Sequence, residues 1–213
     1  VSARGAAKAW TPAVRVGRLK CRIPAWRSDR LKPRLQQLPK ICGMESHLSQ
    51  NLSHDPVHGY IAFVAPRGEA AGEVCERQLI DHPWVQRMRQ IRQLQTAWWV
   101  FPTAEHSRFQ HILGVMHLAS QAVGRLYPSL REVDPSVPDV AVVDGMMRMA
   151  GLLHDVGHGP FGHFFDAHFL SRYGLTHEKL GAQIIVEQLS GVIERLARSP
   201  AGPFPEGVRL KAS

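Results

Sequence analysis

The sequence predicts a mostly α-helical domain with a short strand or hairpin near its start. Two segments in the second half of the chain repeat apolar residues at helical spacing behind a typical capping residue, Asp139 or Thr176. A third such segment begins near Ser107. The strand-like run Tyr60–Val64 follows turn residues at Asp55–Gly59. With 213 residues, 44% of them hydrophobic, the chain is long enough for one domain and hardly for two.

The excess of positive charge lies near the N-terminus. The chain has 26 Lys and Arg residues against 18 Asp and Glu, yet residues 1–50 hold 11 of the basic residues and only two of the acidic ones. This stretch is rich in proline and has no sustained apolar period, so we expect residues 1–43 to be a basic disordered arm and residues 44–213 to fold. The alternative is read-through upstream sequence ahead of a natural start at Met44. A basic arm would also be able to bind nucleic acid, which is one alternative for its role.

The cysteines and the apolar segments bear on the compartment. Cys21, Cys42 and Cys75 form no metal-like pair, and their odd number argues against a secreted disulfide framework. We therefore expect a cytoplasmic protein. No segment approaches the roughly 18 uninterrupted apolar residues of a membrane-spanning helix, so we expect no membrane partner.

Four helices are expected along residues 79–94, 107–126, 139–155 and 176–196, because apolar residues recur there every three or four positions. Between the first two, Trp98–Pro102 is expected to be a buried extended or turn segment with both tryptophans in the core.

Two of these helices carry a histidine in line with an apolar stripe. His111 heads the stripe of residues 107–126, and His154 ends that of residues 139–155. The stripe residues at helical intervals from the two histidines are Val115, Leu118, Ala122 and Leu126, and Val143, Met147 and Ala150. We therefore expect both histidines to point into the domain. The alternative for either one is a hydrogen-bonded core histidine, since a buried ring without partners costs roughly 1 to 3 kcal/mol.

The doublet His154-Asp155 ends its helix directly before a turn rich in glycine. A neutral imidazole beside a carboxylate suits a divalent metal ion such as iron, manganese, zinc or magnesium. His158 and His163 follow on the turn, close enough to serve the same site. Asp166 can orient one of them by accepting its second N–H.

These residues carry a resemblance to a known family. His111 and the doublet His154-Asp155 resemble the first three ligands of the HD-domain metal-dependent phosphohydrolases, a helical family with the signature H…HD…D. Further blocks, in the same order, resemble the deoxynucleoside triphosphate triphosphohydrolases within it. These blocks are Asp55–Gly59, Gln86-Arg87 with Arg89, Gln93-Leu94, Val100–Pro102, Ser107–His111 with Leu113–Val115, and Ala150–Asp166. The resemblance spans about residues 53–198.

The resemblance implies a helical HD scaffold that hydrolyses a deoxynucleoside triphosphate (dNTP) to deoxynucleoside and tripolyphosphate, with a divalent ion held by His111, His154 and Asp155. The other implied roles are proton delivery to the leaving 5′ oxygen by His163, steered by Asp166, contacts to phosphate or water by His158 and His177, phosphate binding by Arg108, and contact with the sugar 3′-hydroxyl by Gln93. An exposed helical glutamine is the alternative for Gln93. Family members commonly assemble, which implies a homo-oligomer.

The sequence departs from the family pattern in two places. The family's last metal ligand is an Asp downstream of the Thr176–Glu178 block, and no Asp follows Asp166 here. We therefore expect a C-terminally truncated HD domain with an incomplete ligand set. In addition, Gln95–Trp99 stands where the family has a glycine run, which leaves less room for a nucleotide.

Other functions stay open. A cyclic-dinucleotide phosphodiesterase of the HD superfamily requires a Gly-Tyr-Pro motif, which is absent. An HD oxygenase would share the metal ligands but not the blocks around Arg108 and Gln93. An HD phosphohydrolase acting on another phosphate ester fits the ligands equally well. An inactive module that binds nucleotide or nucleic acid fits the missing Asp and the basic arm.

Overall fold

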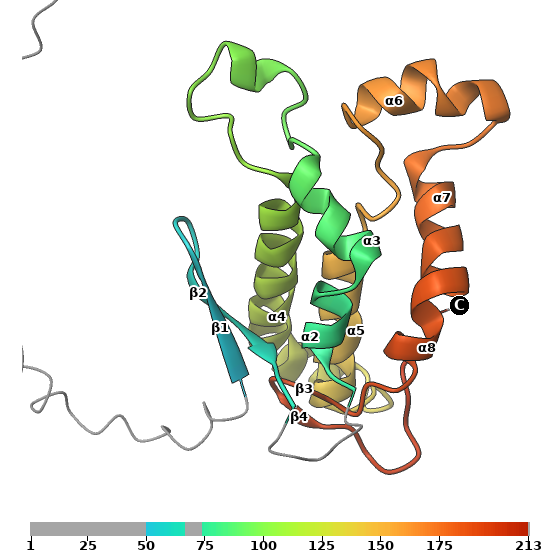
Figure 1. The fold of residues 1–213 in the computed structure, drawn as a ribbon. Coiled ribbons are helices and arrows are strands. Elements are labelled where there is room, and N and C mark those ends of the chain that lie inside the picture. Colours follow the sequence, from blue (N-terminus) through green and yellow to red (C-terminus); the bar gives the residue numbers. More distant parts are fainter. Residues whose placement is uncertain (1–49, 67–73, 213) are drawn as a thin grey trace, which may run out of the picture. The chain divides into compact units, whose positions relative to one another are not determined.

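A computed structural model describes residues 50–66 and 74–212 (Figure 1). The expectation for residues 1–43 lies outside this described part. The first described element is an antiparallel hairpin of β1 (Gln50–Asp55) and β2 (Gly59–Val64), in which Gln50 lies opposite Val64. Its turn forms because the Asp55 carboxylate accepts the N–H groups of Val57 and His58 at 2.8 Å each. A hairpin was one of the two expected forms of this region.

The remaining described elements are mostly helical, as the sequence predicts. They are α2 (Glu76–Ile80), α3 (Pro83–Gln86), the 3₁₀ turns η3 (Arg87–Gln90) and η4 (Ala97–Trp99), α4 (Arg108–Val133), α5 (Val140–Leu153), α6 (His163–His168), the 3₁₀ turn η5 (Leu170–Tyr173), α7 (His177–Ile184), the π-turn η6 (Ile185–Leu189), α8 (Ser190–Ile193), and the two-residue strands β3 (Arg198–Ser199) and β4 (Gly202–Pro203).

The caps explain where the long helices begin. Asp139 accepts the N–H of Ala141 at 2.8 Å in front of α5, and Thr176 accepts the N–H of Lys179 in front of α7. Both residues are the caps that the sequence predicts. Ser107 and Gln110 form a capping box in front of α4. The helix expected over residues 79–94 is instead two short helices and a 3₁₀ turn.

Helices α4 and α5 pack against each other as an antiparallel pair at the centre of the fold (Figure 1). Gly151 permits this close approach, because a Cβ there would lie 3.0 Å from the backbone of Met116. Helix α2, the 3₁₀ turn η3 and the α7–α8 segment complete the core. The buried core includes Ile61, Leu79, Val85, Met88, Ile112, Met116, Leu152, Val156, Leu189 and Leu196.

A buried ion pair joins the hairpin, α2 and α5. The Arg148 guanidinium donates to both carboxylate oxygens of Glu76, at 2.5 and 2.8 Å, and to the carbonyl of Ala62. Glu76 also accepts the N–H of Val64 at 2.9 Å. Both charged side chains are almost completely buried, so each satisfies the polar groups that the other brings into the core.

The prediction of which faces of α4 and α5 point into the core is wrong. Leu118 and Leu126 are exposed on α4, and Met147 is exposed on α5. The buried side of α5 carries Asp144 and Arg148 in place of a purely apolar stripe. Their polar groups form hydrogen bonds with partners far away in the sequence. Because local periodicity does not reveal these partners, the sequence of this buried side looks like that of a solvent-exposed face.

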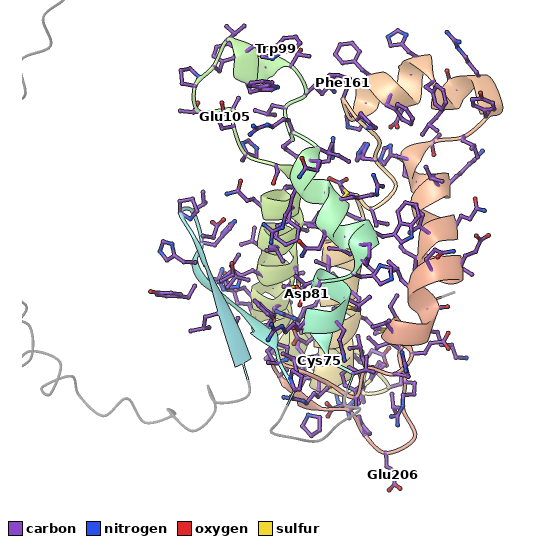
Figure 2. All side chains as sticks on the ribbon, viewed as in Figure 1. Cys75, Asp81, Trp99, Glu105, Phe161 and Glu206 are labelled. Atoms are coloured by element: carbon purple, nitrogen blue, oxygen red, sulfur yellow. The ribbon has the colours of Figure 1, made fainter. Side chains whose placement is uncertain are left out.

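The expected burial of both tryptophans near residue 100 is also wrong. Trp99 is 67% exposed, at the tip of the loop that carries η4 (Figure 2), and Val100 and Phe101 are exposed as well. Trp98 is half-buried, and the guanidinium of Arg92 lies over its ring, 5.1 Å from the centroid. This aromatic run therefore forms a surface loop.

Candidate metal centre and active site

Three side chains expected to hold a metal ion meet where α4 begins and α5 ends. Because the two helices are antiparallel, His111 in the first turn of α4 lies beside His154 at the end of α5. Their Nε2 atoms are 3.3 Å apart, and Asp155 offers its Oδ1 and Oδ2 at 3.4 Å from His154 Nε2 and 3.7 Å from His111 Nε2. The three ligand atoms therefore face one point.

This arrangement fits a divalent ion. Two nitrogens bound at about 2.1 Å to one ion, at angles of about 90° to 110°, lie about 3.0 to 3.4 Å apart, which matches the spacing of the two imidazoles. His154 Nδ1 lies 2.9 Å from the carbonyl of Gly151, so with the proton on Nδ1 the lone pair of Nε2 is free to bind a metal. The side chains of His111 and His154 are 33% and 39% exposed, which leaves the site open to solvent. The prediction that His154 points into the domain is therefore wrong, because the end of α5 lies at the surface.

Arg108 lies directly behind these ligands. Its Nη1 donates to Asp155 Oδ2 at 2.5 Å, and both side chains are buried. Its Nη2 reaches towards Gly162, where a Cβ would come within 2.8 Å of it. The residue expected to bind phosphate is therefore held against a candidate metal ligand in this structure.

The electrostatics of the site favour an anionic Asp155 and the neutral forms of His111 and His158. Burial opposes the ionisation of Asp155, but contact with His158 and the electrostatic interactions with His154 and Arg108 outweigh it and hold the pKa of this carboxyl well below its usual range. The pKa of His111 and that of His158 are lowered, chiefly by burial, although Asp155 opposes both shifts. A carboxylate and a neutral imidazole are the forms that bind a metal ion.

A second cluster of side chains adjoins the first. His158 connects the two, since its Nε2 lies 3.5 Å from Asp155 Oδ1. Its ring stacks on that of His177 with centroids 3.8 Å apart. His177 Nδ1 lies 2.5 Å from Asp166 Oδ2, and His163 Nδ1 lies 3.6 Å from the same oxygen. Three imidazoles therefore surround one carboxylate, and their ligand atoms could also hold a cation.

The side chains of the second cluster differ in solvent exposure. His158 is fully buried, and its Nδ1 has no hydrogen-bond partner among the described residues. His177 and Asp166 are largely buried. His163, on the first turn of α6, is 64% exposed and accessible to a ligand from solvent.

Comparison with known proteins identifies the part of the chain that holds both clusters. The HD domain family model matches residues 108–199, from the start of α4 to β3. This segment therefore has the sequence pattern of an HD domain. The candidate metal ligands His111, His154 and Asp155 and the second cluster all lie within this matched segment.

The curated relatives of this HD domain include dNTP triphosphohydrolases. Deoxynucleoside triphosphate triphosphohydrolase SAMHD1 of Bos taurus is 35% identical over 178 residues, which cover 76% of this chain and 28% of the relative. The human protein of the same name is 39% identical over 140 residues, covering 64% and 20%. Uncharacterized protein YwfO of Bacillus subtilis is 34% identical over 154 residues, covering 72% and 31%. The chain spans less than a third of the length of these relatives.

A solved structure has a similar fold. A crystal structure described as a phosphohydrolase from Bacteroides thetaiotaomicron superposes with a TM-score of 0.53 at 28% sequence identity, covering 68% of this chain and 33% of that one. The chain thus resembles proteins named as triphosphohydrolases in sequence and a protein named as a phosphohydrolase in structure.

The turn that joins the two halves of the HD site depends on glycine. A Cβ on Gly157 would lie 1.9 Å from the carbonyl oxygen of His177 and 2.5 Å from the backbone nitrogen of Gly181. The turn after α5 therefore touches the first turn of α7. This contact brings His177 within stacking distance of His158.

Gln93 lies in the loop between η3 and η4, outside both clusters. Its N–H donates to the carbonyl of His106, and its Oε1 is buried without a hydrogen-bond partner among the described residues. An unsatisfied buried acceptor is costly, which is compatible with a ligand donor such as a hydroxyl group.

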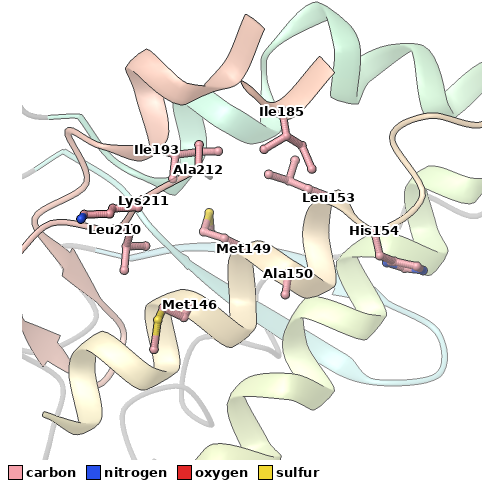
Figure 3. Close-up of a pocket in the computed structure, with 10 residues that line it drawn as sticks. All are labelled: Met146, Met149, Ala150, Leu153, His154, Ile185, Ile193, Leu210, Lys211 and Ala212. Atoms are coloured by element: carbon pink, nitrogen blue, oxygen red, sulfur yellow. The ribbon is translucent and has the colours of Figure 1, made fainter. Parts of the chain in front are cut away.

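An apolar groove of about 480 Å³ runs beside the HD site. Figure 3 shows His154 at one end of this groove and Leu210 and Lys211 at the other, with Met149 and Leu153 between them. Only His154 belongs to the candidate site.

Sequence reasoning gave no role to Arg87, although it belongs to one of the blocks that carry the family resemblance. Its guanidinium donates to the carbonyls of Val156 and His158, on the turn between the two clusters. No local signal could reveal this contact, because the partners lie 69 and 71 residues away.

No helix in the described ranges is long and apolar enough to cross a membrane.

Proposed function

We propose that this protein is a metal-dependent phosphohydrolase that converts dNTPs to deoxynucleoside and tripolyphosphate. The observation that carries the proposal is the junction of the two clusters. Asp155 belongs to the candidate metal centre and lies 3.5 Å from His158, which stacks on His177 beside Asp166. A metal centre in contact with an acid–base group is what hydrolysis of a phosphate ester requires. The similarity to proteins named as dNTP triphosphohydrolases supports this substrate class.

His111, His154 and Asp155 would hold the ion, which is iron, manganese, zinc or magnesium by its ligand set. When bound, such an ion polarises the α-phosphate and lowers the pKa of a bound water. Arg108 keeps Asp155 anionic and oriented through their 2.5 Å contact. A substrate phosphate near Gly162 would also lie within reach of Arg108 Nη2.

We assign both proton transfers of the reaction to the second cluster. The oxygen of water forms a bond to the α-phosphorus, and the bond from that phosphorus to the sugar 5′ oxygen breaks. The stacked pair His158 and His177 accepts the proton of the water, and Asp166 stabilises the imidazolium that results. His163, the most exposed of the three imidazoles, acts as the general acid that donates a proton to the leaving 5′ oxygen. Gln93 contacts the sugar 3′-hydroxyl through its unpartnered Oε1.

Product analysis tests this proposal. The purified protein is supplied with Mn²⁺ or Mg²⁺ and each of the four dNTPs, and deoxynucleoside and tripolyphosphate are quantified together. We expect the two products in equal amounts, with ¹⁸O from labelled water in the tripolyphosphate. A chelator and the substitution Asp155→Asn should each abolish both products. His117→Gln is the control, because His117 lies on α4 away from the site and contacts Gln121.

Other outcomes would contradict the proposal in distinct ways. Release of pyrophosphate and a monophosphate would place the cleavage at a different bond. Hydrolysis of other phosphate esters with no cleavage of dNTPs would keep the HD phosphohydrolase and reject the substrate. Nucleotide binding without any turnover would favour an inactive binding module.

Three further expectations accompany the proposal. A homo-oligomer should be visible by light scattering at micromolar concentration. Nucleic-acid binding through residues 1–43 should weaken steeply with salt and vanish when those residues are deleted. Cytoplasmic location is checked by fractionation of cells that make the protein from its own gene.

A further inference from the structure

Arg87 bridges two segments that are distant in the sequence. It is the first residue of η3, directly after α3, and its Nη1 donates to the carbonyl of His158 at 2.8 Å. Its Nη2 donates to the carbonyl of Val156. One guanidinium thus holds both carbonyls that flank Gly157, on the turn between the metal ligand Asp155 and the second cluster. In Figure 1 the segment after α3 lies beside the loop that leaves α5.

A second contact also holds the turn. The Gly157 backbone is in contact with the carbonyl of His177 and the backbone of Gly181, with no room for a Cβ. The turn is therefore fixed between Arg87 and the first turn of α7. Because His158 and His177 come from these two segments, the position of the turn sets the 3.8 Å stacking of their rings.

The placement of the His158 ring depends strongly on the backbone. The ring is fully buried, but its Nδ1 has no hydrogen-bond partner among the described residues and lies 3.8 Å from Asp166 Oδ2. The contact of its Nε2 with Asp155 is a long one, at 3.5 Å. Side-chain hydrogen bonds of ordinary length therefore do not fix this ring, and the backbone turn has to do so.

We propose that Arg87 is a positioning residue that fixes the His158 ring between Asp155 and His177 by holding the carbonyls of Val156 and His158. It touches neither the candidate metal ligands nor the reacting atoms. Arginine suits this task because its planar fork presents two donors at a fixed spacing, whereas lysine presents a single charged group. Arg87 is half-buried and lies over the ring of Trp84 at 5.2 Å, which limits its own freedom.

The first test needs no enzymatic activity. NMR spectra of the ring protons of His158 and His177 are compared in the full chain and in the variants Arg87→Met and Arg87→Lys, at one pH and without metal. Protons over a stacked ring have displaced chemical shifts, so loosening the turn should move both sets of signals towards ordinary values. We expect a larger change for Arg87→Met than for Arg87→Lys. The signals of His54 on the hairpin should stay in place.

The second test uses the proposed hydrolysis and therefore rests on the proposed function. We expect kcat to fall about 10- to 100-fold in Arg87→Lys, since a displacement of about 1 Å can cost a factor of 100. KM and the bound metal should stay within twofold of the starting protein, because Arg87 does not contact the metal ligands. Arg125→Lys, at an exposed position of α4, is the matched control and should leave all these quantities unchanged.

The outcomes separate the positioning role from a purely structural one. If the His158 and His177 signals are unmoved in a folded Arg87→Met, or if the His54 signals shift to the same extent, the proposal is wrong. If Arg87→Met does not fold, Arg87→Lys decides by the same criterion. If the starting protein does not cleave dNTPs, the proposed function fails while the NMR comparison still decides on Arg87.

Discussion

The guanidinium of Arg108 and the carboxylate of Asp155 form a buried ion pair, with Nη1 and Oδ2 2.5 Å apart. Asp155 also lies within 3.4 to 3.7 Å of three imidazoles, those of His111, His154 and His158. One carboxylate therefore belongs to the candidate metal centre and contacts the acid–base cluster, and Arg108 fixes its orientation. Changes at either residue should affect both halves of the site.

Substitution of Arg108 should weaken metal binding although Arg108 cannot itself bind a cation. We expect Arg108→Lys to lower the affinity for Mn²⁺ by about 10- to 100-fold, the usual effect of removing a group that orients a ligand. Isothermal titration of the metal-stripped protein measures this change. Arg77→Lys is the control, because Arg77 forms an exposed ion pair with Asp81. Equal affinities for Arg108→Lys and the unmodified protein would show that the pair does not organise the metal centre.

A methyl group at Gly157 should separate the two halves of the site. In Gly157→Ala the added carbon would lie 1.9 Å from the carbonyl oxygen of His177, so the turn or α7 must move. We expect a loss of about 1 to 3 kcal/mol in the free energy of unfolding and a clear fall in kcat. Urea denaturation and product assays measure the two effects. Gly191→Ala on α8, where nothing lies within 4 Å, should leave kcat unchanged and raise stability by about 0.5 to 1 kcal/mol, and an unimpaired Gly157→Ala would refute the contact.

Removing one partner of the buried pair Glu76–Arg148 should destabilise the protein strongly, whereas replacing both partners should cost less than the two single changes together. Glu76→Gln leaves a buried guanidinium without its counter-charge, so we expect a loss of about 3 to 5 kcal/mol in the free energy of unfolding. Arg148→Met should cost a similar amount. The double variant Glu76→Gln with Arg148→Met should be less destabilised than the two single losses added together. Additive losses in urea denaturation would mean that the two residues act independently.

The stability of the metal-free protein should fall in acid in two stages. His111 and His158 have lowered pKa values when folded, so below their ordinary value of 6.5 the unfolded chain binds more protons and is favoured. The pKa of Asp155 is lowered too, so its contribution is present above its ordinary value of 3.8 and is lost as pH falls further. Urea midpoints from pH 8 to pH 3 measure this. Constant stability between pH 7 and pH 5 would contradict the assigned histidine shifts.

The elements were predictable where the signal is local. Asp139 and Thr176 cap α5 and α7 through hydrogen bonds to residues two and three positions ahead, and the sequence contains both partners. The sequence also singled out His111, His154 and Asp155 as candidate metal ligands, and their ligand atoms do converge in the structure.

The buried faces of α4 and α5 were not predictable from periodicity. The α5 helix has apolar residues on more than one side, so a helical period fits several stripes equally well. Its true inner side includes Arg148 and Asp144, whose partners Glu76 and Ser120 lie 72 and 24 residues away. Only the tertiary structure shows that these charges are satisfied. The contacts of Arg87 escaped prediction for the same reason.

The most direct test of this account is anomalous diffraction from crystals of the protein grown with Mn²⁺. We predict a single strong peak about 2 to 2.4 Å from Nε2 of His111, Nε2 of His154 and a carboxylate oxygen of Asp155, lost in crystals of Asp155→Asn. A peak among His158, His163, Asp166 and His177 alone, or the absence of any peak at His111 and His154, would contradict the assignment of the metal centre.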